Sequence, residues 1–444
     1  MNGTPLPPLP PLEPRLQRRY GRLVKEHMHV GQRVAAGLGA LPGAGTSFAS
    51  TQAAWRFYRN EAVTLEALAE PLIQEARAAV PEACDTHALV MHDWSHLHYG
   101  RHTRKTDRRR LGQGTAHGYE LQSALLVGDR AGQPLAPLCQ NVAAADGLHT
   151  SRAPAPQPVP SRLDELLGRM EHLAGLELGR PLVHIIDREA DSVGHFRQWR
   201  GHLHLVRVKG GQNVQAPDGV RRRLSAVADT LAAAGDGLAY VREIEHRGTT
   251  ARQHVGETAV VLTRAARPQR KGQPRRTEAG DPVSLRLVVS EIRDGAGRVL
   301  ARWFLLSNVP ATVAAATLAL WYHWRWRIES FFKLVKGAGQ QIEAWQQRSA
   351  PAVAKRLLVV SAACVLVWRL ARSPDPAAAE LRAVLVRLSG RQLRRGAQAT
   401  APALLAGLWN LLSLLDLLQH RTLPELQRLA QSLFTTPPPD VRLV

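Results

Sequence analysis

Short apolar runs and helix-spaced apolar residues alternate through the first half of the chain. The runs "THALVMHD" (86–93) and "PLVHIID" (181–187) each stop at an aspartate and read as buried strands. Residues 119–143 read as two strands joined by a turn at Asp129–Gly132, and 202–209 as a further strand. Residues 163–176 are predicted to be helical, with Ser161 and Asp164 at capping-box spacing.

The second half begins with β-rich patterns and ends with helical ones. Residues 211–280 are polar and Gly-rich and include the basic loop "RPQRKGQPRR" (267–276), and 283–308 predicts a long hairpin turning at Asp294–Gly297. Helices are then expected over 311–336, near 354–371 and near 403–420. Together with two basic helical segments before residue 70, this order predicts an α/β protein built on a mixed sheet.

The segment "WYHWRWRIESFFKLVKG" (321–337) predicts an amphipathic helix with an unusual polar stripe. At about 100° per residue the stripe holds one tyrosine, one glutamate and three cations, and the opposite face is apolar. The stripe residues are Tyr322, Arg325, Glu329, Lys333 and Lys336. A solvated face with i,i+4 ion pairs is the plainer interpretation. The surplus of positive charge around one carboxylate instead favours a polyanion with a metal ion beside it.

Composition favours a nucleic-acid partner. The 444 residues contain 58 Lys and Arg against 37 Asp and Glu, a formal net charge of +21, at an ordinary hydrophobic content of 45%. Such an excess points first to nucleic acid and less often to an anionic membrane. The apolar window 357–368 is shorter than the roughly 20 residues of a membrane span, so a buried helix is expected there.

Cysteine usage and the N-terminal residues bear on the compartment. The three cysteines (Cys84, Cys139 and Cys364) form no CxxC pair, which argues against a disulfide framework and fits a reducing cytoplasm. The opening "MNGTPLPPLPPLEP" has no apolar signal-peptide segment and is expected to be Pro-rich and disordered.

Three carboxylates are the candidate catalytic and metal-binding groups. Asp93 and Asp187 each follow an apolar strand, and two such strands side by side would bring the carboxylates together. Glu329 would join them from a helix packed on the sheet. Like charges held close repel unless a cation neutralises them, and an all-oxygen set favours Mg²⁺ or Mn²⁺. Taken singly, an aspartate at a strand end is more often a cap or turn residue.

Four sequence motifs carry a resemblance to a known family. "YHWRWRIESFFKLVK" matches a Y-(2)-R-(3)-E-(6)-K signature at Tyr322, Arg325, Glu329 and Lys336. "DREAD" (187–191), "HDWSHLHYG" (92–100) and "TQAAWRFYRNEAV" (51–63) resemble its second-Asp, first-Asp and N-terminal segments. On these motifs the chain resembles the insertion sequence four family of DDE transposases over about residues 15–372.

The resemblance implies a fold, an activity and partners. The expected fold is an RNase H-like core with a β-rich insertion. The expected activity is Mg²⁺-dependent cut-and-paste transposition by end binding, nicking, hairpin formation and strand transfer. The partners would be double-stranded DNA, as terminal inverted repeats and target, and a second copy of the chain in a homodimer. A bacterial cytoplasmic location on the nucleoid follows. The residues expected to contact DNA are Tyr322, Arg325, Lys333, Lys336, Trp303, Arg207 and Lys209.

The same reasoning sets domain boundaries. We expect an N-terminal helical DNA-binding region at 1–70, a catalytic core at 71–210 and 308–372, the insertion at 211–307 and a C-terminal helical region at 373–444. A dimerisation role for the helix near 403–420 and an intramolecular core role are equally open. For Trp303, stacking on a flipped base near the DNA end and burial within the insertion are also balanced.

Two other classes of function stay open at this point. One is a DNA-binding inhibitor of transposition on the same fold, against which the three intact carboxylates argue. The other is an RNase H-like nuclease without strand transfer. A zinc site at His96 and His98 is a weak alternative, because the sequence shows no further ligand set.

Overall fold

The computed structural model describes residues 8–28, 47–112, 114–235, 237–266, 277–392 and 399–435. The basic loop 267–276 and residues 1–7 of the Pro-rich opening lie outside these residues. The strands are β1 (Ala88–His98), β2 (Arg109–Arg110), β3 (His117–Gly128), β4 (Pro134–Ala143), β5 (Leu148–Thr150), β6 (Leu182–Ile186), β7 (Leu203–Val208), β8 (Asn213–Gln215), β9 (Arg221–Arg223), β10 (Ala239–His246), β11 (Thr249–Leu262), β12 (Val283–Arg293) and β13 (Val299–Ser307).

Helices flank this sheet. They are α1 (Pro14–Met28), α2 (Ser47–Arg59), α3 (Leu65–Ala83), α4 (Arg162–Ala174), α5 (Val193–Gln198), α6 (Leu224–Ala233), α7 (Ala315–His323), α8 (Trp326–Val335), α9 (Ala350–Arg372), α10 (Pro376–Leu388), α11 (Ala401–Leu418) and α12 (Leu423–Thr435). The N-cap half of the predicted capping box is present, because the Ser161 hydroxyl accepts a hydrogen bond from the Asp164 amide at the start of α4 and donates one to the Asp164 carboxylate.

Five strands form the centre of the sheet in the order β4-β3-β1-β6-β7. β1 pairs antiparallel with β3 and parallel with β6, and β6 pairs parallel with β7. A mixed sheet with two hairpin-linked strands on one side and two parallel strands on the other is the RNase H-like arrangement. The fold class expected from the sequence is confirmed.

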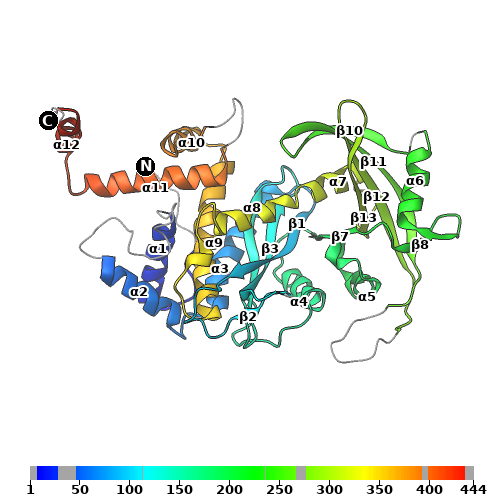
Figure 1. The fold of residues 1–444 in the computed structure, drawn as a ribbon, viewed down its shortest axis with the longest axis horizontal. Helices are drawn as coiled ribbons and strands as arrows, with labels where there is room; N and C mark the ends of the chain where they lie inside the picture. Colours follow the sequence, from blue (N-terminus) through cyan, green and yellow to red (C-terminus); the bar gives the residue numbers. More distant parts are fainter. Residues whose placement is uncertain are drawn as a thin grey trace, which may run out of the picture.

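The β-rich segment does not form a separate sheet. β13 pairs antiparallel with β7, and the sheet then continues through β12, β11, β8 and β9. The predicted hairpin is β12 and β13 (Figure 1). One sheet therefore runs from the five central strands into the segment expected to be an insertion, so a shift of that segment would be felt at β7.

Alternating residues of the strands divide the core into two apolar layers. On β6, Val183 and Ile185 face the larger layer, which contains α3, α7 and α9, while Ile186 faces a smaller layer under α4, α5 and α6. This follows from the two-residue repeat of a strand, which sends successive side chains to opposite faces. Both faces of β6 are covered, which explains its almost continuous apolar sequence.

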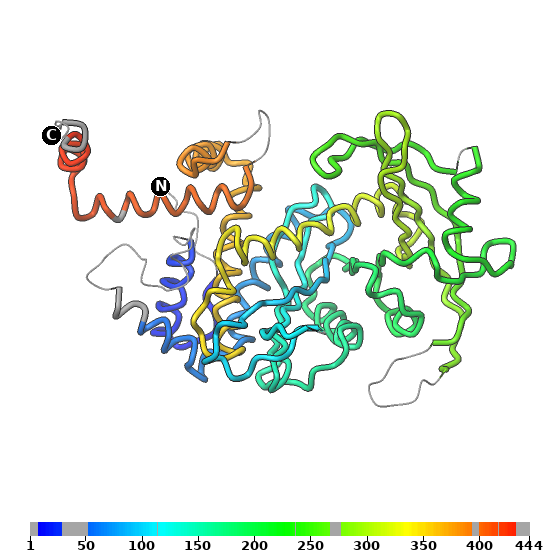
Figure 2. Tube along the Cα trace, in the orientation of Figure 1, coloured from blue at the N-terminus to red at the C-terminus, as the bar shows by residue number. Residues whose placement is uncertain are grey.

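The helix α9 is the axis of the larger layer. It is the one helix in the described part of the chain long and apolar enough to cross a membrane, yet 83% of its most apolar window is buried. It contacts α1, α3, β4 and α11, so a buried core helix, as predicted, describes it. In Figures 1 and 2, α11 projects away from the body toward α12. Four leucines of α11 are exposed: Leu414, Leu415, Leu417 and Leu418.

The predicted single helix over 311–336 is wrong in one respect, because it is broken into α7 and α8. Trp324 and Arg325 form a tight turn in which the Arg325 amide bonds to the Tyr322 carbonyl three residues back. Such a 3₁₀ step rotates the following residues relative to a continuous α-helix. The turn lies against the β3–β4 loop, where Arg327 donates to the Gly132 carbonyl at 2.8 Å.

Gly132 is required where this loop meets the helix break. Its φ is +64°, and a Cβ at this position would lie 2.3 Å from the Trp324 ring. We predict that Gly132→Ala lowers the free energy of unfolding by about 2–4 kcal/mol, through left-handed backbone strain and overlap with the indole. Thermal unfolding followed by circular dichroism measures the loss.

Gly112→Ala is the matched control, because Gly112 has the same φ of +64° and nothing within 4 Å of the added Cβ. This variant should lose only the backbone part, about 1–2 kcal/mol. Equal losses in the two variants would show that the contact with Trp324 contributes nothing.

Candidate active site

Two aspartates lie side by side on neighbouring strands. The parallel pairing of β1 with β6 ends at His92 and Ile186, so Asp93 and Asp187 are the next residue on each strand. Asp187 follows the end of β6, as predicted. Asp93 does not end its strand, because β1 continues to His98 through antiparallel pairing with β3. The prediction missed this continuation, because Ser95, His96 and His98 interrupt the apolar run while their backbone is still paired with β3.

The third carboxylate comes from α8, which packs on β1 and β3. All three carboxylates contact one guanidinium, that of Arg325. Its Nη2 lies 2.7 Å from Glu329 Oε1 and 3.6 Å from Asp187 Oδ2, and its Nη1 lies 3.2 Å from Asp93 Oδ2. The Arg325 side chain is only 5% exposed. The predicted constellation is therefore assembled, with the arginine at its centre.

The two aspartates are in different electrostatic environments. Burial raises the pKa of the Asp93 carboxyl to about 6, although Arg325 and the Trp94 amide act in the opposite direction. Burial also acts to raise the pKa of Asp187. There the guanidinium of Arg325, the Arg188 amide, Arg207 and the Tyr322 hydroxyl together hold the pKa below its usual value. Asp187 is thus the more firmly ionised of the two.

The donor set suits a hard divalent cation, because it consists of carboxylate oxygens. The side chains of Asp93, Asp187 and Glu329 are 20%, 33% and 28% exposed, so they are accessible from solvent. In this conformation the three carboxylates are spaced around the guanidinium of Arg325. Among the described residues, no three His, Cys, Asp or Glu side chains lie close enough together to hold a metal ion. Closing on an ion would require these carboxylates to turn away from Arg325.

The residues expected to contact DNA divide into buried and accessible ones. Tyr322 is buried, and its hydroxyl donates to Asp187 Oδ1 at 3.0 Å. Lys333 is exposed and lines the site cavity with Lys336, whose ammonium donates to the His96 carbonyl at 2.6 Å. Tyr322 and Arg325 therefore organise the carboxylates in this conformation, whereas Lys333 is placed to meet a ligand.

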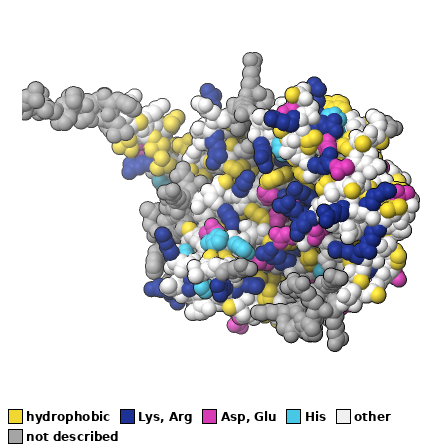
Figure 3. All heavy atoms as spheres, turned by 45° about the vertical axis from the view of Figure 1, so that its right-hand side comes forward, with side chains coloured by type: hydrophobic (Ala, Val, Ile, Leu, Met, Phe, Trp, Pro, Cys, Tyr) yellow, Lys and Arg dark blue, Asp and Glu magenta, His cyan; other side chains and the backbone are white. Residues whose placement is uncertain are grey.

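Two further cationic residues lie on or just after β7, the strand that pairs with β6. Arg207 on β7 lies 3.7 Å from Asp187 Oδ1, and Lys209 is exposed just beyond the strand. Figure 3 shows that Lys and Arg side chains gather on one face of the molecule, with a small group of acidic side chains among them. This arrangement suits a polyanion that is attracted to the face and acted on at the carboxylates.

Trp303 is a core residue in this conformation. It is 7% exposed, lies edge-on to Tyr322 at 5.3 Å and stacks on His323 at 6.3 Å between ring centroids. Because only 7% of Trp303 is exposed, the stacking role expected from the resemblance would require Trp303 to leave these contacts. Between the two interpretations left open by the sequence, this geometry is that of the buried strand residue.

Two aromatic residues near the site were not singled out from the sequence. Trp94 lines the site cavity beside Asp93 and Glu329, and the Arg162 guanidinium lies 4.9 Å from its ring centroid. Trp326 is 52% exposed at the start of α8. The sequence signal for Trp94 is its position directly after Asp93.

The histidines near β1 have different environments. His92 is buried and its Nε2 lies 2.9 Å from His184 Nδ1, which links the two strands that carry the aspartates. His96 and His98 have ring centroids 6.2 Å apart, and His96 lies 3.8 Å from Glu120. The part of the chain that the structure describes gives no third ligand for a zinc site here.

Comparison with known proteins gives one clear match. The family model described as "Transposase DDE domain" matches residues 86–368, which include all three carboxylates. No curated protein sequence matches the chain. Among solved structures, the cryo-EM structure of a piggyBac transposase synaptic complex with hairpin DNA is similar at 10% identity and a TM-score of 0.33. The alignment covers 81% of this chain and 59% of that chain, and a likeness this low carries no argument.

The central position of Arg325 predicts how stability depends on pH. Arg325→Met would leave Asp93, Asp187 and Glu329 without their shared cation and raise the pKa of Asp93 above its present value of about 6. A carboxyl with a raised folded pKa stabilises the fold at low pH, and this contribution is lost as the pH rises through that pKa. Asp187 loses its counterion at both pH values because its pKa is held low, so the variant's loss of Tm should be present near about pH 5 and clearly larger near about pH 8, where Asp93 is also ionised.

Asp93→Asn in the Arg325→Met background is the control, because it removes one of the repelling charges. This double variant should recover part of the lost Tm near about pH 8 and little at acidic pH. A loss of Tm that is the same at both pH values would mean that Arg325 acts through packing and not through charge.

Proposed function

The chain belongs to the transposase DDE domain family, and we propose that it is a DNA transposase that cuts and joins DNA strands by metal-dependent phosphoryl transfer. The observation that carries the proposal is the convergence of Asp93, Asp187 and Glu329 on one cation, Arg325. The accessible cavity beside them is also lined by Lys333 and Lys336. Three carboxylates held this close are unfavourable without a cation, which argues against an incidental surface cluster.

Each residue of the site has a proposed task. Asp93, Asp187 and Glu329 would hold Mg²⁺, or Mn²⁺ in its place, which when bound activates the attacking oxygen and stabilises the leaving oxygen. Tyr322 orients Asp187 through its hydroxyl. Lys333 and Lys336, which line the same cavity, would bind phosphates of the DNA strand. Arg325 would neutralise the carboxylates and then turn to the DNA backbone.

The finer proposal follows the Y-(2)-R-(3)-E-(6)-K spacing. We propose membership of the insertion sequence four group, with terminal inverted repeats as substrate and cleavage by nicking, hairpin formation and strand transfer. The four signature residues lie around one cavity or beside its carboxylates; they are Tyr322, Arg325, Glu329 and Lys336. This placement supports the signature as a functional unit. The exposed leucines of α11 support a homodimer as the working assembly.

Glu329→Gln tests the catalytic proposal, because it keeps the shape of the side chain and removes its charge. With Mg²⁺ and a duplex carrying the inverted repeat that flanks the reading frame, we expect nicking to fall about a hundredfold or more. DNA binding should persist, since the substitution removes a negative charge from a face that attracts DNA. Gel analysis of labelled strands measures the nick.

Glu343→Gln is the matched control for this experiment. Glu343 lies 3.5 Å from the Lys336 ammonium, and among the described residues it forms no ion pair with Arg325. Nicking by this variant should stay close to that of the unmodified chain. Near-normal nicking by Glu329→Gln would rule out the assignment of Glu329 as a catalytic ligand.

Lys333 gives a second test, of DNA contact at the site. It is exposed, and no described carboxylate forms an ion pair with it. Lys333→Ala should reduce the slope of log affinity against log salt concentration by about one unit, the expected effect of one lost phosphate contact. Fluorescence anisotropy with a labelled duplex gives the slope.

Arg428→Ala removes the same charge from an exposed position on α12 and should leave the slope unchanged. If the two variants have the same slope as the unmodified chain, Lys333 lies on a solvated face and does not touch DNA.

A further inference from the structure

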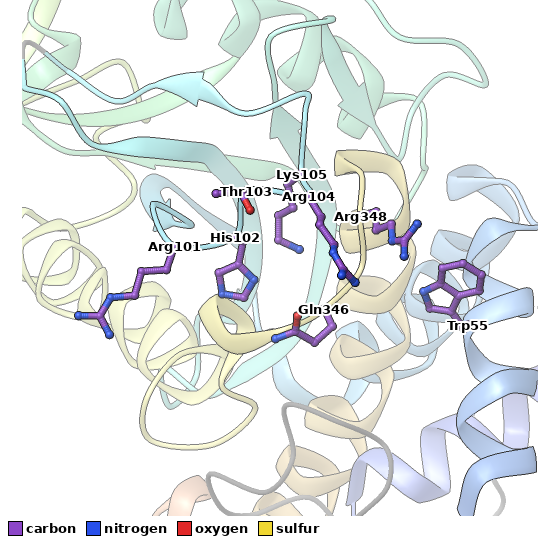
Figure 4. Close-up of a pocket in the computed structure, with 8 residues that line it drawn as sticks. All are labelled: Trp55, Arg101, His102, Thr103, Arg104, Lys105, Gln346 and Arg348. Carbon is purple, nitrogen blue, oxygen red and sulfur yellow. The ribbon is translucent and has the colours of Figure 1, made fainter.

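A second cavity lies between α2, the loop after β1 and the segment before α9. Its volume is about 610 Å³, and eight residues line it, as Figure 4 shows. We call it the Trp55 pocket, and its lining residues are Trp55, Arg101, His102, Thr103, Arg104, Lys105, Gln346 and Arg348. None of them lines the cavity beside Asp93 and Glu329.

The pocket is basic and open. Four of the eight lining residues are Lys or Arg, and none is Asp or Glu. Arg101, Arg104 and Arg348 are exposed, and no carboxylate of the described residues forms an ion pair with any of them. Three exposed arginines around one cavity repel one another weakly through solvent, and a bound anion would relieve that repulsion.

Trp55 organises one side of the pocket. The guanidinium carbon of Arg59 lies 4.4 Å from its ring centroid, and that of Arg348 lies 5.5 Å from it. Figure 4 shows Arg348 beside the Trp55 indole, which comes from α2. Cation–π contact restricts the Arg348 side chain while its N–H groups are still available for a ligand.

Lys105 has a different role from the arginines. Its ammonium is buried and donates to the backbone carbonyls of Trp345 and Gln347. It therefore fixes the segment before α9 to the loop after β1 and is not available to a ligand. Burial lowers the pKa of Lys105 to about 8, and the two carbonyl acceptors act in the opposite direction by stabilising the ammonium. The floor of the pocket is thus rigid, and its rim carries the free cations.

The two segments that line the pocket, after β1 and before α9, are continuous with residues that contact the active site. Glu343 accepts a hydrogen bond from the His98 amide at the end of β1, and lies 3.5 Å from the Lys336 ammonium of the site cavity. From Asp93 to His98 the strand extends about 17 Å. On a straight duplex this corresponds to roughly five base pairs at 3.4 Å per step.

We propose that the Trp55 pocket binds the phosphodiester backbone of DNA at a second point, about five or more base pairs from the phosphate at the active site. The inference rests on the proposed function, because it assigns this surface to the same DNA. Exposed guanidiniums spread around an open rim suit successive phosphates of a polymer better than one small anion, which a closed, converging site would hold.

The test measures DNA binding in EDTA, so that it does not depend on catalysis. The probe is a fluorescein-labelled 30-bp duplex, titrated at a series of KCl concentrations. Arg101→Ala/Arg104→Ala should reduce the salt slope by about two units, which corresponds to two lost phosphate contacts. Arg387→Ala/Arg428→Ala removes the same charge from exposed residues of α10 and α12 and should leave the slope unchanged.

The outcomes separate the pocket from the proposed function. If the unmodified chain does not bind the duplex, the proposed function itself fails. If it binds and the Arg101/Arg104 variant keeps its slope, only the pocket assignment is overturned. Inorganic phosphate at equal ionic strength should displace DNA no better than KCl. Stronger displacement by phosphate, lost in the variant, would identify a small-anion site and overturn the assignment to DNA.

A double-mutant cycle tests the role of Trp55. If Trp55 acts by holding Arg348, Trp55→Leu and Arg348→Ala should each weaken duplex binding, and the double variant should be no weaker than Arg348→Ala alone. Additive losses would show that Trp55 does not act through Arg348. Circular dichroism of Trp55→Leu confirms that the chain is folded.

Discussion

The structure depends on how three carboxylates are kept together in a partly buried site. Asp93, Asp187 and Glu329 repel one another, and burial of Asp93 increases the unfavourable effect of its charge. In this conformation the guanidinium of Arg325 contacts all three and neutralises part of that charge. The three carboxylates are therefore gathered around Arg325 and not in the spacing of a metal site, and their positions are fixed by elements that come from distant parts of the chain.

The rest of the fold keeps those elements in register. The parallel pairing of β1 and β6 places the two aspartates next to each other. The break between α7 and α8 allows Tyr322 to reach Asp187 while Glu329 stays over β1, and Gly132 gives this break room against the β3–β4 loop. Because β13 extends the same sheet from β7, the β-rich segment supports Arg207 beside Asp187.

Much of this arrangement was predictable from sequence, because local patterns determine it. The helices and strands were predicted from strand alternation, the Ser161 cap and the turn at Asp294–Gly297. The third carboxylate was predicted from the helical spacing of Arg325 and Glu329. Tertiary contacts determined what was missed. Polar residues after Asp93 conceal a strand that continues by pairing with β3, and the helix break at Trp324 depends on a loop almost two hundred residues away. The burial of Trp303 depends likewise on α7, not on its own strand pattern.

The central claim is that the three carboxylates together bind a divalent metal where DNA is cut. The most direct measurement counts the Mn²⁺ ions bound to the complex of the full chain with duplex DNA. Electron paramagnetic resonance gives this number for the unmodified chain and for Asp187→Asn. Asp187 is the residue to change, since its carboxyl is more firmly ionised than that of Asp93. The account predicts that Asp187→Asn binds the duplex but loses Mn²⁺ at the site. Unchanged Mn²⁺ binding by this variant would contradict it.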